Sequence, residues 1–90
     1  QFLDAGYADE AARMYKLICM QLAFKWCHDR DFKPDWENIN EGKYFLCFDS
    51  KDSTFLVQGA SYIQLNTVYF SNEDIAQKCA NWLNSQLGGE

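Results

Sequence analysis

The chain has 90 residues, of which 48% are hydrophobic and 17% aromatic. This length suits one small domain, the apolar content excludes a disordered tail, and 1 Pro with 5 Gly excludes a fibrous or proline-rich repeat. The formal net charge of −5 disfavours direct binding to nucleic-acid phosphates or to anionic lipid.

Residues 8–27 are expected to form one long helix, because they contain no Gly or Pro and are rich in helix formers. The opposite sides of this helix both carry apolar residues. Leu17, Met20 and Phe24 lie at helical spacing on one side, and we expect them outside the core as a surface for partner binding or self-association. The other side is expected to pack on the rest of the domain. It carries Ala8, Ala11, Tyr15, Ile18, Cys19, Leu22 and Trp26.

Residues 29–42 form a polar, irregular segment interrupted by Pro34, here called the acidic loop. A loop of this length with several large apolar residues is expected to be fixed on the core, and Phe32, Trp36 and Ile39 are its predicted anchors.

The acidic loop contains five carboxylates and only two basic side chains. Such a surface can occupy a basic nucleic-acid channel on another protein by imitating phosphate charge, so the loop predicts a partner-binding site. An ordinary solvated loop is the simpler alternative, and a cation site or a glycosidase-like carboxylate pair is a further one. The predicted partner-binding residues are Asp29, Asp31, Asp35, Glu37 and Glu41.

Three strands are predicted after the loop. Residues 43–48 alternate in the manner of a strand, and residues 54–58 are rich in strand formers, with a polar turn between them. Residues 62–70 alternate loosely and are expected to add a third strand. Apolar residues on both faces predict a sheet that is covered at least partly on both sides.

A final helix is predicted after Ser71, which forms a capping-box pattern with Asp74. Trp82 flanks its apolar face, and Gly88 with Gly89 supplies the stop. All 90 residues are therefore predicted to form a single α+β domain of order α-β-β-β-α, a three-stranded antiparallel meander packed by an N-terminal and a C-terminal helix. The apolar face of the last helix carries Ile75, Ala76, Cys79, Ala80, Leu83 and Leu87.

The sequence lacks the common catalytic and cofactor motifs. It contains neither a glycine-rich phosphate loop nor a nucleophile elbow. The single histidine, His28, adjoins Cys27, but neighbours on a helix point about 100° apart and do not form a nucleophile–base pair. No two cysteines have Cys-x-x-Cys spacing. We therefore expect no catalytic residue, no cofactor, no metal and no enzymatic activity, with a small hydrolase as the distant alternative.

Three segments of the chain carry a family pattern. They are Phe32-Lys-Pro-Asp-Trp36, Lys43-Tyr44 and Val68-Tyr-Phe-Ser-Asn-Glu-Asp-Ile-Ala76. Together they resemble a family of small phage- and prophage-encoded α+β proteins, whose members typically carry W-x-P-D-W, then N-x-x-K-Y-Y, then V-x-F-x-S-x-E-x-A at the start of a last helix. Here Phe32 and Phe45 replace the first Trp and the last Tyr. The resemblance covers about residues 32–83, and it implies the fold and a phage origin but no reaction.

These features predict a small acidic phage-type accessory protein that binds a host or phage protein, for example as an anti-CRISPR-like inhibitor of host defence. The alternative is a self-associating structural or assembly protein of a phage, a homo-oligomer without inhibitory role. No apolar run approaches the roughly 20 residues that cross a bilayer, and no signal-peptide pattern is visible. The expected location is the cytoplasm of an infected or lysogenic bacterium, without membrane or direct nucleic-acid binding.

The four cysteines are expected to be reduced, because Cys19, Cys47 and Cys79 lie in apolar runs that are typical of buried thiols. Thiol titration of the denatured, non-reduced protein should therefore count 4 free thiols. A count of two or none would contradict both the redox state and the expected compartment.

Overall fold

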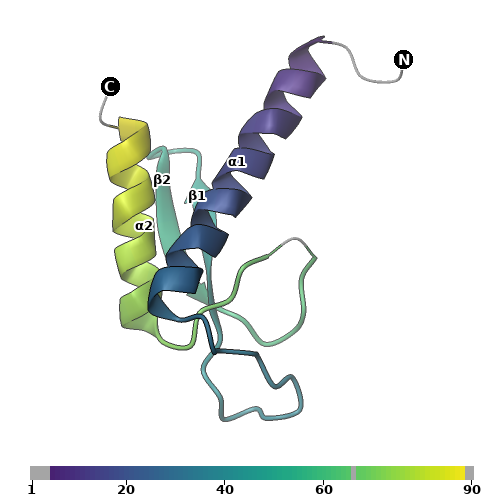
Figure 1. Ribbon diagram of the computed structural model, residues 1–90, viewed down its shortest axis with the longest axis vertical. Helices are drawn as coiled ribbons and strands as arrows, with labels where there is room; N and C mark the ends of the chain where they lie inside the picture. Colours follow the sequence, from purple (N-terminus) through teal and green to yellow (C-terminus); the bar gives the residue numbers. More distant parts are fainter. Residues whose placement is uncertain (1–4, 66, 89–90) are drawn as a thin grey trace.

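The computed structural model describes residues 5–65 and 67–88, and Figure 1 shows two helices beside a small sheet. Helix α1 spans Ala5–His28 and helix α2 spans Glu73–Gly88. Between them lie strand β1, Tyr44–Asp49, and strand β2, Thr54–Gly59. The protein is therefore α+β, as predicted, and both helices and the first two strands lie within a few residues of their predicted positions.

Strands β1 and β2 pair antiparallel, and the pair ends where Asp49 faces Thr54. The Asp49 side chain accepts a hydrogen bond from the backbone N–H of Lys51 at 2.9 Å. Ser53 completes the connection with a φ of 56°, the left-handed conformation that lets so short a turn reverse the chain. The predicted hairpin is confirmed.

The predicted third strand, residues 62–70, is reduced to one bridge in the described part of that segment. Phe70 and Tyr44 exchange both backbone hydrogen bonds, at 2.8 and 3.1 Å. Before this bridge the chain folds back on itself, because the Tyr69 hydroxyl accepts a hydrogen bond from the backbone N–H of Gln64 at 2.8 Å. In an extended strand, residues separated by five positions lie about 17 Å from each other. A segment that makes this hydrogen bond between Gln64 and Tyr69 therefore cannot be an extended strand.

Helix α2 covers one face of the sheet and supplies most of the core. Phe70 and Leu83 are fully buried. Asn84 binds the Phe55 backbone of β2 twice: its Oδ1 accepts from the N–H at 2.7 Å and its Nδ2 donates to the carbonyl at 3.3 Å. Burial raises the pKa of the Cys79 thiol to about 12. The predicted apolar face of the last helix is confirmed by its buried residues, Ala76, Cys79, Ala80 and Leu83.

Helix α2 begins one residue later than the capping-box pattern predicts. The cap is Asn72, whose Oδ1 accepts the backbone N–H of Ile75 at 2.9 Å. Ser71 does not cap the helix, because its hydroxyl donates to the carboxylate of Asp29 at 2.8 Å instead. A contact distant in sequence therefore replaces a local one. The side chain of Leu87 and the predicted stop at Gly89 lie outside the described residues.

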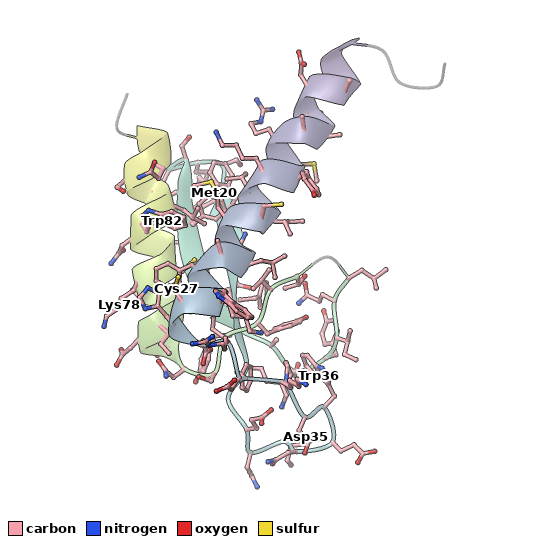
Figure 2. The ribbon with its side chains drawn as sticks, viewed as in Figure 1. Met20, Cys27, Asp35, Trp36, Lys78 and Trp82 are labelled. Atoms are coloured by element: carbon pink, nitrogen blue, oxygen red, sulfur yellow. The ribbon has the colours of Figure 1, made fainter. Side chains whose placement is uncertain are left out.

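Helix α1 packs on α2 through the side that we expected to lie outside the core. Leu17, Met20 and Phe24 all pack against the core cluster. The ring centroid of Phe24 lies 5.8 Å from that of Trp82 and 6.4 Å from that of Phe70. Figure 2 shows Met20 and Trp82 where the two helices adjoin. The prediction of an external apolar face is wrong, and with it this surface for partner binding or self-association.

The side of α1 that was expected to face the core is mostly exposed. Tyr15 is 72% exposed, Leu22 52% and Trp26 65%, whereas Ile18 packs on the core. Cys19 on this side is exposed as well, so it is not the buried thiol that its apolar neighbours predict. In Figure 1 the N-terminal half of α1, in purple, extends away from α2 and the sheet.

Replacing Leu83 by Ala is expected to lower the free energy of unfolding by about 2–5 kcal/mol, because it leaves a cavity in the core. Urea unfolding followed by circular dichroism measures this change. The matched control is Leu65→Ala, at a residue that is 88% exposed, where a shift below about 0.5 kcal/mol is expected. Equal losses in the two variants would contradict this core.

Candidate protein-binding surface

Lys43 lies at the base of the acidic loop and is only 5% exposed. Its Nζ donates to the carbonyl of Asn38 at 3.0 Å and to that of Glu41 at 3.3 Å, and pairs with the Glu41 carboxylate at 3.2 Å. It also lies 5.2 Å from the centroid of the Trp36 ring. A buried ammonium is tolerated only where such partners surround it, so Lys43 fixes the second half of the loop from within.

Glu41 connects Lys43 to the first half of the loop. Its Oε1 accepts the backbone N–H of Asp35 at 2.7 Å. This hydrogen bond, assisted by Lys43, lowers the pKa of the Glu41 carboxyl against the opposing effect of desolvation. Asp35 in turn accepts the backbone N–H of Glu37 at 3.1 Å, which shapes the turn between them. Glu41 therefore acts as an internal tether of the loop.

Asp29 fixes the start of the loop to the start of α2. Its two carboxylate oxygens accept the backbone N–H and the hydroxyl of Ser71, at 2.6 and 2.8 Å. Charge-assisted hydrogen bonds of this kind are among the stronger ones in proteins. Two of the five predicted partner-binding carboxylates, Asp29 and Glu41, thus have structural roles.

Aromatic packing joins the loop to the second face of the sheet. The Trp36 ring meets the buried Tyr69 ring edge-on, with 5.0 Å between centroids, and Tyr69 meets Phe45 of β1 at 6.2 Å. Phe32 is half-buried beneath the Lys25 ammonium, which lies 5.3 Å from its centroid. The predicted anchoring role of Phe32 and Trp36 is therefore confirmed, and the sheet is covered in part on both faces.

The outer side of the loop carries carboxylates and one large apolar side chain. Asp31, Asp35 and Glu37 are exposed. Ile39 is 94% exposed, so its predicted role as an anchor is wrong. Figure 2 shows the arrangement: Asp35 lies toward the far end of the loop, while Trp36 lies nearer the body of the protein.

A second exposed segment adjoins the acidic loop. A small cleft of about 110 Å³ separates them, lined by Trp36 and Ile39 on one side and by Ala60 and Ser61 on the other. Residues 62–65, which follow, expose three large apolar side chains. The exposed surface near the loop is thus both acidic and apolar, a composition suited to binding a protein. The exposed residues are Tyr62 at 68%, Ile63 at 60% and Leu65 at 88%.

An apolar cleft of about 380 Å³ lies between the end of α1 and α2. Cys27 and Trp82 are among the residues that line it, and Figure 2 shows both side chains where the two helices adjoin. The His28 ring is tilted by 35° against that of Phe24, with 4.3 Å between centroids. Within residues 5–65 and 67–88, no three His, Cys, Asp or Glu side chains are grouped closely enough to hold a metal ion. In the same part of the chain, no helix is long and apolar enough to span a membrane.

Sequence reasoning missed Lys43 and Tyr69 as the residues on which the loop depends. The sequence places Lys43 only at the start of the first predicted strand and in the family pattern, and Tyr69 only in the predicted third strand and in that pattern. The one available indication was local: Lys43 lies between the acidic Glu41 and the strand residue Tyr44, where a buried lysine needs a carboxylate close by.

In comparisons with known proteins, no family model, no curated sequence and no solved structure matches this chain. The resemblance to phage-encoded proteins, and the protein-binding function expected from the acidic loop, therefore stay predictions from the sequence.

The free energy of unfolding should be lower in Glu41→Gln than in the wild type at pH 7, and this difference should shrink in acid. A carboxyl whose pKa is lowered by folding stabilises the protein in full above its ordinary pKa, 4.5 for Glu41, and this contribution is lost as the pH falls through the folded-state value. Urea unfolding of both proteins from neutral pH into the acid range measures the effect.

The control is Glu37→Gln, which removes an exposed carboxylate of the same loop. Its free energy of unfolding is expected to stay within about 0.5 kcal/mol of the wild type at pH 7. A Glu41→Gln difference that stays constant across the pH range would show that the charge of Glu41 does not fix the loop.

Proposed function

We propose that this chain is a non-enzymatic phage-type accessory protein that binds a basic surface of a host protein through its acidic loop, as an anti-CRISPR-like inhibitor of host defence. One observation supports this most. The loop has no helix or strand, yet Lys43 fixes it from within while Asp31, Asp35 and Glu37 remain exposed. A binding loop that is ordered before contact avoids most of the entropy loss on association.

The partner is expected to combine a basic groove with apolar contact points. The formal charge of −5 favours association with a positively charged surface, and the nucleic-acid channel of a nuclease is such a surface because it binds phosphates. Ile39 and the apolar residues 62–65 add contacts that salt does not screen. Nucleic-acid phosphates supply negative charge but no such apolar contacts. The chain would therefore compete with nucleic acid for the basic groove and bind its partner more specifically than phosphate does.

Two side chains of types common in catalysis are engaged in packing. The His28 ring lies against Phe24, and Cys79 is buried with a raised pKa, which keeps its thiol protonated. Protein binding is accordingly proposed in place of catalysis.

Changing Asp31 to Asn, Asp35 to Asn and Glu37 to Gln together should leave folding intact and weaken partner binding at least about tenfold. Asn at position 35 keeps an oxygen that can accept the Glu37 N–H, so the turn survives. The immobilised wild type and variant are compared for proteins that they retain from a bacterial lysate, and each retained protein is then tested for displacement of bound DNA by the free chain.

The matched control removes three exposed carboxylates elsewhere, with Glu10→Gln, Asp52→Asn and Glu73→Gln. It should retain the same proteins as the wild type, and raising the salt concentration should release them. If partner affinity is indifferent both to the loop substitutions and to ionic strength, or if the retained protein keeps its DNA, phosphate mimicry is wrong.

A further inference from the structure

The exposed side of α1 carries an apolar seam with the spacing of a coiled coil. Its residues are separated alternately by four and three positions, which is a 3.5-residue period over most of the helix. Every one of them is exposed. This α1 seam consists of Ala8, Ala12, Tyr15, Cys19, Leu22 and Trp26.

The seam lies opposite the side that packs on α2. Leu17, Met20 and Phe24 face the core, and a helix turns by about 100° per residue, which places Trp26 and Ala8 180° from Leu17. The body of the domain therefore does not block the seam. The N-terminal half of α1 also stands clear of α2 and the sheet in Figure 1.

We propose that the α1 seam binds the α1 seam of a second copy of this chain, with the two helices antiparallel. This alignment pairs each small seam residue with a large one. Tyr15 faces Cys19 of the second copy, and the four remaining residues pair likewise across the two chains. Small against large at successive layers fills the space between helices at the density of a protein core. The outer pairs are Ala12 with Leu22 and Ala8 with Trp26.

A parallel alignment fits the same residues poorly. It would face Ala8 with Ala8 at one end, leaving a void, and Trp26 with Trp26 at the other, which forces the helices apart. Burial of Trp26 against Ala8 of the second copy would also remove apolar ring surface from water, since a buried aromatic side chain removes about 150–250 Å².

Charge complementarity favours the antiparallel alignment as well. Asp9 lies in the second turn of α1, beside the seam, and Lys25 lies in the last turn. Arg30 extends the basic end, because its guanidinium lies 4.9 Å from the centroid of the Trp26 ring. Pairing Trp26 with Ala8 of the second copy brings this guanidinium toward Asp9 of that copy, whereas a parallel pair would bring Arg30 toward Arg30.

Sedimentation equilibrium of the complete, reduced chain tests the proposal. The wild type should show twice the chain mass of 10.5 kDa, and Leu22→Lys should raise the dimer dissociation constant at least about tenfold. The matched control, Ile39→Lys, makes the same change at another exposed residue and should leave the dimer intact. A monomeric wild type, or equal effects of the two substitutions, would overturn the proposal.

Cysteine cross-linking tests the orientation. In a Cys27→Ser background, mild oxidation should link few chains, because Cys19 faces Tyr15 and not the second Cys19. Adding Tyr15→Cys should give covalent dimers on a non-reducing gel, since cysteines 15 and 19 of opposite chains then face each other. Dimers already linked through Cys19 in the background protein, or none after Tyr15→Cys, would overturn the antiparallel alignment. Neither result depends on the acidic loop. The dimer can therefore be disproved while the proposed function holds, and the proposed function can be disproved while the dimer holds.

Discussion

The packing of α2 on the β1–β2 hairpin is the contact on which the rest of the structure depends. Two strands alone are only marginally stable in water, so their apolar face needs a cover. Leu83 and its buried neighbours on α2 supply it, and Asn84 fixes the register of the helix by bonding both backbone groups of Phe55. Phe70, buried in the same core, then bridges to Tyr44 and provides the ring edge that Phe24 of α1 meets.

The second face of the hairpin determines the shape of the acidic loop. Phe45 points to this face, Tyr69 packs on it, and Trp36 packs on Tyr69. Lys43 emerges at the edge of β1 beneath Trp36 and neutralises Glu41. The carboxylates are thus divided by function: some hold the loop together, and the others remain exposed where like charges are screened by water and salt.

The two proposed surfaces lie at different parts of the molecule but are connected through α1. The helix carries the seam on its exposed side, and its end continues directly into the acidic loop. In the proposed antiparallel dimer the two loops therefore point in opposite directions. Such a dimer would present two separated acidic surfaces, and a partner with two basic sites would bind it with added avidity.

The sequence by itself determined the elements: the α+β class, the limits of both helices within a few residues, the hairpin, and the apolar face of α2. These follow from local periodicity, turn residues and chain composition, which are properties of neighbours in sequence. It also indicated that Phe32 and Trp36 anchor the loop, because large aromatic residues in a polar loop need a place to be buried.

Only the tertiary structure decided which side of α1 meets the core. Both sides carry apolar residues, and Phe24 rather than Trp26 finds Phe70 and Trp82 to pack against. The tertiary structure also decided that the Ser71 hydroxyl donates its hydrogen bond to Asp29, 42 positions away, and does not cap helix α2. Partners so distant in sequence leave no local pattern, and for that reason the buried Lys43, the folded-back segment before Phe70 and the exposed α1 seam could not be predicted from periodicity alone.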